Sequence, residues 1–526
     1  MLRVLLTILL SSVMSAVFSQ YILSPLNPEH GALMDAHMAK SELRSDFAVK
    51  PYLLGMQELD SIFDADTKNW TRREYESWVM RKLKNEHLFE VHSDDFHLQG
   101  DAAFNLEASN YADDQGRRAY TNTRGYVFNG MIGKRIFFHT TFFESQSIFP
   151  NYMDSVVSSR GDFNEKGGSK FLSRGSVPGY GRWKSFTRYK SSYDYDYTLA
   201  TGSFGVVLNR QSYLQFGHEK QFVGHGHRSM LLSDASSPFP FLKAQIGFWQ
   251  NRITYTTTYA VLQSLERIIN IGYANKENMF RRLGARFHYL SFQPAGWFSF
   301  GFFDATTWTW RKNSSPGSIE YYSPHGWIYT GNGIRNHITG INGQVNLFKM
   351  LQGYGQYAVN VKGRGQAAQV GLKLYGPIYN LVMQIEYNKV GQSFYFYAED
   401  STNTVFIKEP LQTGTNALDY YQHNDLMLGH PMGIALDEVI LKLNYRLRDL
   451  FTSASVNYIK LNSISNPTTI QNIRVEAGYV INPKSNAQIA AGLIYRTEDR
   501  VNGGSFNTTY PFVAFRTNLF NRYMDF

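Results

Sequence analysis

From residue 96 onward, apolar and polar residues alternate with a period of two over long stretches. In one of the clearest segments, Ile473 and Val475 alternate with Asn472 and Glu476. This pattern gives a β-strand one apolar face and one polar face. The segments run for about ten residues or more, whereas most globular strands have ~5–6 residues and a bilayer crossing needs ~9–11. The alternation therefore predicts strands that cross a membrane.

Eighteen such strands can be placed along the chain, with short turns on one side and long connections on the other. They lie at 96–108, 119–132, 134–146, 195–208, 212–222, 241–249, 252–262, 281–292, 297–308, 339–349, 354–362, 366–375, 378–389, 436–447, 451–462, 470–481, 485–496 and 508–519. The alternation of turns and loops, with an even number of strands, is typical of bacterial outer-membrane barrels. We therefore predict an all-β fold, a transmembrane antiparallel β-barrel of about eighteen strands over residues 96–526.

The composition agrees with a barrel and excludes some kinds of site. The chain has 35 Tyr, 38 Phe and 8 Trp, as expected of aromatic girdles at the two membrane boundaries. It has no Cys, which excludes disulfide bonds, thiolate metal sites and cysteine nucleophiles. The net charge of +9 is spread thinly along the chain. A solvated lumen and loops explain that charge, and attraction to anionic glycan or lipopolysaccharide is the alternative.

Residues 1–19 have the pattern of a signal peptide. Arg3 precedes the apolar stretch 4–10, and Val17-Phe18-Ser19 forms a small-residue cleavage site. The apolar stretch is shorter than the ~20 residues that a spanning helix needs. We therefore expect export from the cytoplasm and residence in the outer membrane.

Residues 20–95 are richer in charge and in helix formers than the rest of the chain. Thr71 and Glu74 form a capping box, after which Tyr75, Trp78, Val79 and Leu83 recur at helical spacing. This predicts a helix over residues 72–85, with its apolar stripe packed against the periplasmic mouth or the lumen of the barrel. We therefore interpret residues 20–95 as a helical periplasmic or plug segment.

Two stretches carry a resemblance to a known family. Residues 217–245 contain Gly217, Gln221, Gly224 and Gly226, then Leu231-Leu232-Ser233-Asp234-Ala235, Pro238 and Pro240. Residues 420–438 contain Leu428-Gly429-His430-Pro431 and Gly433. In these residues the chain resembles the Wzi-like capsule assembly family, in the version found in Bacteroidota that includes gliding-motility relatives. The resemblance spans roughly residues 95–526, with Val223 at a position where the family has Trp.

The resemblance implies an eighteen-stranded outer-membrane barrel, plugged on the periplasmic side by helices, that holds surface polysaccharide. It implies binding and capsule or exopolysaccharide assembly. From the motifs weighed below we expect no catalysis, and we expect no cofactor. The expected partners are cell-surface polysaccharide and outer-membrane lipid or lipopolysaccharide, and no nucleic acid. Two other roles stay open at this point, a porin-like transporter and an accessory component of a gliding or secretion apparatus.

The long outer connections contain aromatic residues with basic neighbours, which suits stacking on sugars and pairing with uronic acids. The candidates for glycan contact are Tyr180, Arg182, Trp183, Trp310, Tyr322, Trp327 and Arg335. The alternative for such residues is packing within the loops and anchoring at the membrane boundary.

Residues 225–234 contain side chains that could form a metal site or a serine nucleophile. His225 and His227 are spaced like metal ligands on one face of a strand, but Gly224 and Gly226 favour a tight loop. Ser229 lies near these histidines without a nucleophile-elbow pattern around it. Ser233-Asp234 resembles turn chemistry. We therefore expect neither a metal site nor an enzyme.

Overall fold

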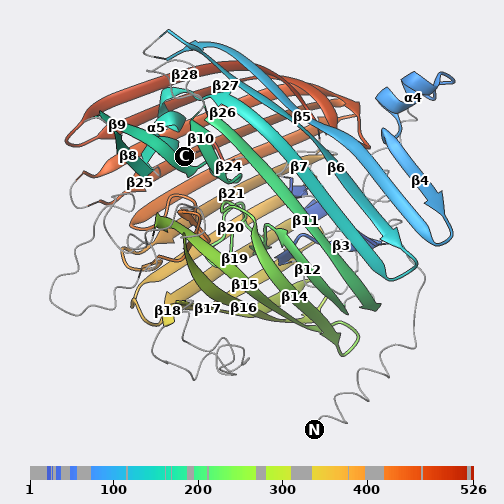
Figure 1. Ribbon diagram of the computed structural model, residues 1–526. Helices are drawn as coiled ribbons and strands as arrows, with labels where there is room; N and C mark the ends of the chain where they lie inside the picture. Colours follow the sequence, from blue (N-terminus) through green and yellow to red (C-terminus); the bar gives the residue numbers. More distant parts are fainter. Residues whose placement is uncertain are drawn as a thin grey trace.

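The computed structural model describes residues 21–525 except 25, 28–30, 33, 37–47, 56–72, 114–115, 160–161, 167–168, 186–194, 210–211, 268–279, 310–333, 377, 379, 397–419, 464–465 and 518–522. Within this part of the chain, eighteen antiparallel strands form a closed barrel (Figure 1). The all-β prediction and its number of strands are confirmed.

The wall strands follow one another around the ring in chain order. They are β5 (Phe96–Ala112), β6 (Arg118–Ile132), β7 (Ile136–Ile148), β11 (Tyr195–Asn209), β12 (Ser212–Glu219), β14 (Phe239–Phe248), β15 (Ile253–Arg267), β16 (Phe280–Ala295), β17 (Phe298–Thr309), β18 (Ile334–Leu347), β19 (Leu351–Asn360), β20 (Gln366–Tyr375), β21 (Leu381–Val390), β24 (Leu436–Leu447), β25 (Leu450–Leu461), β26 (Thr468–Asn482), β27 (Ala487–Arg500) and β28 (Gly504–Arg516). Each coincides with one predicted strand, with ends that differ by a few residues.

Two pairings between distant segments hold the ring together. β28 pairs with β5 from Phe512↔Ser109 to Arg516↔Asn105, which joins the last wall strand to the first. β7 pairs with β11 across the long insertion between them, with Ala200 opposite Phe142. Closure leaves no open sheet edge along most of the wall, as a membrane-crossing sheet requires.

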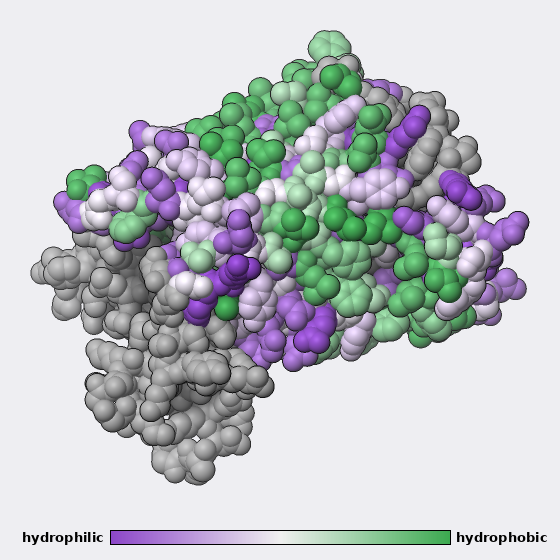
Figure 2. All heavy atoms as spheres, turned by 90° about the horizontal axis from the view of Figure 1, so that it is seen from above, coloured by the Kyte–Doolittle hydropathy of each residue, from purple (hydrophilic) through white to green (hydrophobic). Residues whose placement is uncertain are grey.

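The predicted alternation sets the two faces of the wall. On β21 the side chains of Met383 and Ile385 are exposed on the outside, whereas Glu386 and Asn388 are buried in the lumen. On β26 Val475 is exposed and Asn472 is buried. Figure 2 shows apolar side chains across the middle of one side of the barrel, with polar residues toward the ends. An outer face of this kind is stable against hydrocarbon.

The connections also follow the prediction. Turns at one end of the barrel are short and adopt left-handed backbone, as at Trp249-Gln250-Asn251 and at Phe348-Lys349. Paired positive φ angles suit tight hairpins between twisted strands. The longer connections, such as those between β7 and β11 and between β21 and β24, start from strand ends at the other end of the barrel. No helix among the described residues is long and apolar enough to cross a membrane.

Several shorter elements complete the structure. They are β1 (Tyr21–Leu23), β2 (Val49–Lys50), β3 (Leu53–Gly55), α4 (Trp78–Lys84), β4 (Phe89–Ser93), α5 (Asn151–Ser159), β8 (Asp162–Lys166), β9 (Ser169–Ser176), β10 (Arg182–Ser185), β13 (Phe222–Val223), β22 (Gln422–His423) and β23 (Leu426–Met427). β13 occupies the end of the predicted strand 212–222. The wall strand β12 stops at Glu219, because residues 222–223 turn into the lumen and pair with β2.

The described part of the N-terminal segment lies in the barrel as short strands together with helical residues at 31–32 and 34–36, rather than as helices alone (Figure 1). β1 and β3 pair with each other, and Tyr21 and Leu23 pack against Met131, Phe137 and other lumen-facing residues of the wall. The interpretation of residues 20–95 as helical is thus not confirmed, although the described residues between 21 and 55 do lie in the lumen.

The helix expected over residues 72–85 begins only at Trp78, and its stripe is not buried. Glu74 and Tyr75 precede the helix, and Thr71 lies outside the described residues. Trp78, Val79 and Leu83 are exposed, which corrects the expectation that they pack against the mouth or the lumen. The physical reason is competition for space, because β1, β2 and β3 already occupy that end of the lumen.

A charged side chain introduced at the middle of the outer face tests which side of the wall faces lipid. We expect Val475→Arg to lower the free energy of unfolding in lipid vesicles by about 2–4 kcal/mol, because it places a cation in hydrocarbon. Phe348→Arg is the matched control, since Phe348 is exposed at a turn and a cation near the interface costs only about 0–1 kcal/mol. Urea titration measures both values, and equal losses would contradict the assignment of the outer face.

Candidate functional site

Two segments that leave the wall meet inside the lumen. Residues 220–238 connect β12 to β14, and residues 420–435 precede β24. The backbone N–H of Ser233 donates to the carbonyl of Leu428 at 2.5 Å. The Tyr421 hydroxyl donates to the carbonyl of Leu231 at 2.9 Å. The two stretches that carry the family resemblance are therefore in direct contact, although they lie far apart in the sequence.

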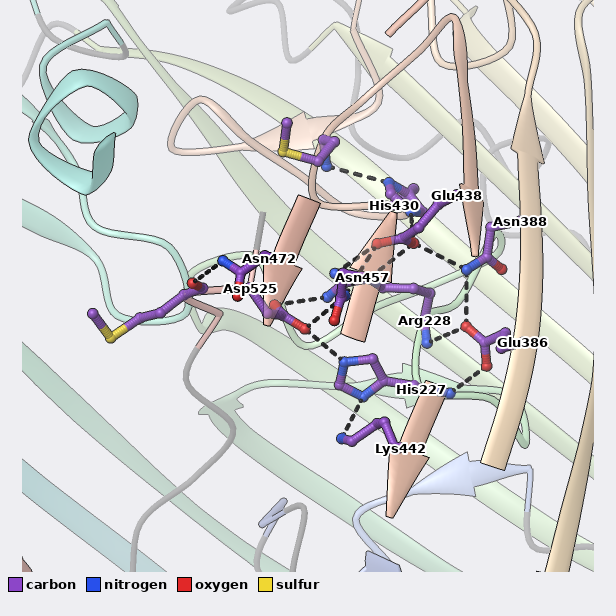
Figure 3. A network of polar contacts seen from close by, with 12 residues as sticks. His227, Arg228, Glu386, Asn388, His430, Glu438, Lys442, Asn457, Asn472 and Asp525 are labelled. Atoms are coloured by element: carbon purple, nitrogen blue, oxygen red, sulfur yellow. Dashed lines mark hydrogen bonds and ion pairs between the residues drawn. The ribbon is translucent and has the colours of Figure 1, made fainter. Parts of the chain in front are cut away.

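Arg228 is the centre of the polar network between these segments and the wall (Figure 3). Its side chain is fully buried, and its Nη2 donates to Glu438 Oε1 at 2.9 Å while its Nε donates to Glu438 Oε2 at 3.3 Å. His430 Nε2 lies 2.7 Å from the same carboxylate. The wall residue Glu438 thus binds one residue from each inward segment.

Glu386 on β21 holds the backbone of the first segment. Its carboxylate accepts the N–H groups of His227 at 2.7 Å and Arg228 at 3.0 Å. Asn388 donates to both Glu386, at 2.9 Å, and Glu438, at 3.0 Å, and so links the two carboxylates. Each buried charge is therefore paired or hydrogen-bonded, as burial in a low-dielectric interior requires.

The last described residues complete the network. Arg228 Nη1 donates to Asp525 Oδ1 at 3.2 Å, and His227 Nε2 lies 3.0 Å from Asp525 Oδ2. The Tyr523 hydroxyl donates to Asp234, which belongs to the first motif. Residues 523–525 therefore lie in the lumen and bind the centre of the interior.

Glycines of the motifs permit close approaches. A Cβ on Gly226 would lie 2.6 Å from Glu386 Oε2 and 2.7 Å from Gln369 Oε1, and a Cβ on Gly429 would lie 2.2 Å from the Tyr395 hydroxyl. Gly224 has a φ of 146°, which L side chains rarely adopt. Close packing inside the barrel therefore explains why glycine occurs at these positions.

The remaining motif residues serve the same packing. Ser233 Oγ accepts the N–H of Ala235 at 3.2 Å. Gln221 accepts a hydrogen bond from Lys243 at 3.1 Å, and Gly217 lies in β12 against Ser203 of β11. Pro431 is buried beside His430. The motif residues are therefore part of the lumen structure, a role that their spacing did not reveal.

Aromatic residues fill the long-loop end of the barrel. Tyr180 packs edge-to-face on Tyr197 with ring centroids 4.9 Å apart, and Trp183 packs on Tyr195 in the same way at 4.8 Å. α5 packs among these rings through residues that include Met153. Tyr180 and Trp183 are buried, so for these two candidates the structure favours loop packing over glycan contact.

The other glycan candidates are placed differently. Arg182 is exposed, with its guanidinium carbon 5.3 Å from the centroid of the Phe280 ring. Trp310, Tyr322 and Trp327 lie outside the described residues. Arg335 lies in β18, at a position whose side chain is not described. The structure therefore does not gather these residues into one described site.

A cavity of about 100 Å³ lies between the N-terminal segment and the strands β20, β21 and β24. Lys373 on its wall donates to Asp35 at 2.5 Å and to the carbonyl of His225 at 2.5 Å. Burial would raise the pKa of Asp35, but the ammonium groups of Lys373 and Lys50 outweigh burial and lower it. These ion pairs attach residues 21–55 to the inside of the wall.

Burial controls the ionisation of the groups inside the lumen. It lowers the pKa of His225 to about 3, assisted by Lys50 and Lys373, and it lowers the pKa of His423 to about 3. Burial opposes ionisation of Asp525, but Arg228 and His227 hold its pKa well below the usual range. His225 and His423 are therefore neutral and Asp525 is ionised near neutral pH.

The candidate metal and nucleophile residues are used in packing. Among the described residues, no group of three or more His, Asp or Glu side chains is arranged to hold a metal ion. His227 contacts Asp525 and Lys442. Ser229 Oγ is buried, donates to the carbonyl of Val223 at 2.6 Å and accepts two backbone N–H groups. The contacts of Ser229 are those of a loop-stabilising residue.

The sequence analysis missed four residues that organise the interior, namely Arg228, Glu386, Glu438 and Asp525. One signal was present, because Glu386 and Glu438 occupy the polar face of predicted strands. Charged residues on that face must find partners when the lumen is filled. The identity of those partners depends on which segments enter the lumen.

Comparison with known proteins identifies the fold. No family model and no curated protein sequence matches this chain. Wzi from Escherichia coli, whose structure is described as that of a carbohydrate-binding β-barrel involved in group 1 capsule assembly, is similar with a TM-score of 0.53 and 12% identity, over 94% of this chain and 99% of Wzi. OpdK of Pseudomonas aeruginosa, solved with vanillate, has a TM-score of 0.44 and 9% identity over 80% of this chain and 98% of OpdK. The likeness to Wzi shows a shared fold.

Acidification is expected to weaken the interior. The pKa values of His225 and His423 in the folded protein are about 3, below the ordinary value of about 6.5. As the pH falls below 6.5, the unfolded protein binds protons at these histidines and the folded protein does not. The free energy of unfolding is therefore highest above pH 6.5 and decreases as the pH falls from 6.5 toward 3. At pH 4.5 the loss is up to about 3 kcal/mol for each histidine.

Urea unfolding in detergent at pH 7.5 and pH 4.5 measures this effect. We expect His225→Asn to lose less stability than the wild type between the two pH values, whatever its stability at pH 7.5. If the variant and the wild type lost the same amount, His225 would not contribute to the acid sensitivity.

Proposed function

We propose that this protein is an outer-membrane β-barrel with a permanently filled lumen that binds surface polysaccharide at its long-loop end and supports capsule or exopolysaccharide assembly. It acts by binding, without catalysis and without a cofactor. The single observation that carries this proposal is the Arg228 network, because it ties the two inward segments, the wall and the end of the chain into one buried unit.

The filling of the lumen favours a binding protein over a porin-like transporter. The described residues between 21 and 55 lie at the short-turn end, the Arg228 network lies in the middle, and the aromatic cluster with α5 lies at the long-loop end. A conducting pore needs a continuous polar path, and three successive packed layers oppose one. Buried ion pairs of this kind lock a single arrangement, because removing one partner leaves an uncompensated charge.

The placement in the outer membrane is supported by the apolar outer face of the closed ring. Signal-peptide export fits that placement, although residues 1–19 lie outside the described part of the chain. The short-turn side would then face the periplasm, and the long loops would face the exterior.

The choice of polysaccharide as the ligand is supported by the resemblance of two sequence stretches to the Wzi-like family, whose residues meet inside this barrel. The fold similarity to Wzi over nearly the whole of both chains agrees with it. An accessory role in a gliding or secretion apparatus is compatible with the same filled barrel, and co-purification of envelope partners distinguishes the two roles.

Polysaccharide binding can be measured with purified capsule or exopolysaccharide and detergent-solubilised protein. We expect the triple variant Arg182→Ala, Trp310→Ala and Trp327→Ala to bind about tenfold or more weakly, because a few aromatic and arginine contacts usually dominate a binding surface. Trp249→Ala is the control, since Trp249 is exposed at the opposite end of the barrel. Undiminished binding by the triple variant would refute this choice of residues.

Planar-bilayer recording tests the filled lumen. We expect the wild type to be nearly silent, and we expect it to stay so when residues 21–55 are removed, because the Arg228 network still spans the middle. Conductance should rise when residues 224–232 are also replaced by a short glycine linker. Steady conductance of the wild type would instead favour the porin-like role.

A further inference from the structure

The segment 78–93 forms an apolar surface on the outside of the barrel at its short-turn end (Figure 1). It comprises α4 and β4, and it exposes six large apolar side chains. They are Trp78, Val79, Leu83, Leu88, Phe89 and Val91. Soluble surfaces seldom gather so many large apolar groups, and such patches usually contact a membrane or a partner.

α4 is attached to the rim of the wall by specific contacts. The side-chain amide of Asn482, at the end of β26, donates to the carbonyls of Lys82 at 3.0 Å and Glu86 at 2.9 Å. The Lys84 ammonium lies 5.6 Å from the centroid of the Tyr479 ring, and Tyr479 is itself exposed on the outer face. The helix therefore sits beside the apolar wall, at its edge.

The connection to β4 is equally fixed. Asp101 of β5 accepts the N–H of Leu88 at 2.9 Å, and its other oxygen lies 2.6 Å from His87 Nδ1. β4 then pairs with β5 in the register Phe89↔Gly100 and Val91↔Leu98. The orientation of the exposed surface is therefore determined by the wall itself.

This register places the apolar side chains of β4 on the outer face of the barrel. On β5 the residues His97 and Asp101 are buried toward the lumen, so Leu98 and Gly100 face outward. Residues opposite each other in an antiparallel pair share a face. Phe89 and Val91 therefore extend the outer apolar face beyond the end of β28.

The short-turn rim carries other exposed aromatic residues. Trp249, Trp297 and Phe348 are exposed at three of the turns. Trp is enriched where a membrane meets water, since its ring is largely apolar and its N–H is polar. Trp78 is exposed at the same end of the barrel, on the side where β26 and β5 hold α4 and β4.

Basic side chains accompany Trp78. Arg81, Lys82 and Lys84 occupy the last turn of α4, and Glu86 pairs with Arg81 at 2.9 Å and with Lys82 at 3.0 Å. Long basic side chains can place their stems in the apolar zone and their charges among lipid phosphates. Apolar residues at Trp78, Val79 and Leu83 with cations nearby match the chemistry of a phospholipid surface.

We infer that α4 and β4 dock into the head-group region of the phospholipid leaflet that faces the periplasm. The occupant of this surface is lipid, because the surface continues the lipid-facing wall and lies at the same end of the barrel as the rim aromatic residues. The inference rests on the membrane placement within the proposed function, and it is independent of polysaccharide binding.

Tryptophan quenching by brominated lipids tests this inference on the full-length protein. The protein is reconstituted in vesicles of phosphatidylethanolamine and phosphatidylglycerol, with or without bromine on the acyl chains near the head groups. Subtracting the emission of Trp78→Phe from that of the wild type isolates Trp78. The same subtraction with Trp297→Phe isolates a residue of the wall rim.

We expect brominated lipid to quench Trp78 to an extent similar to Trp297. Val79→Asp with Leu83→Asp should reduce the quenching of Trp78 at least about twofold, because acidic groups oppose insertion among acyl chains. The exchange Glu76→Gln is the control, since Glu76 is exposed outside the helix, and it should leave the quenching unchanged.

The outcomes separate the two proposals. If Trp297 is quenched and Trp78 is not, the docking of α4 is overturned and the membrane placement stands. If neither is quenched, the membrane placement itself fails. If Trp78 is unquenched while light scattering reports a dimer that Val79→Asp dissociates, the surface binds a second copy of this chain and the lipid assignment is wrong.

Discussion

The pairing of β28 with β5 is the constraint on which the rest of the structure depends. Without the pairs from Phe512↔Ser109 to Arg516↔Asn105, the sheet would keep two open edges. Unpaired backbone groups are costly in hydrocarbon, so the wall can face lipid only after this contact between the two ends of the sheet has formed. Closure also creates the interior, since it turns the polar faces of eighteen strands toward one another.

That interior holds charges that water no longer solvates fully, and the inward segments supply their partners. Glu386 and Glu438 project from the wall, and Arg228 with its neighbouring backbone N–H groups satisfies both. Asp525 adds the end of the chain to the same unit. The network thus converts wall, loops and C-terminal residues into one packed body, which is the structural basis for the proposal that the barrel binds rather than conducts.

Filling the lumen has a consequence outside it. Because β1, β2 and β3 occupy the short-turn end of the lumen, α4 lies on the exterior, where Asn482 and Tyr479 contact it. Its exposed apolar side chains lie beside the outer wall for that reason. The same packing of the N-terminal strands in the lumen therefore explains both the filled interior and the exterior surface proposed to contact lipid.

The sequence by itself determined the strands, their number and the face that each residue occupies, because a period of two is a local property of the chain. The alternation alone places Val475 on the outer face and Asn472 in the lumen, whatever the neighbouring strands are. Only the tertiary structure decided what fills the lumen. The partners of Arg228, the burial of Trp183 and the exposure of Trp78 depend on which distant segments meet once the ring has closed, and local periodicity carries no information about such meetings.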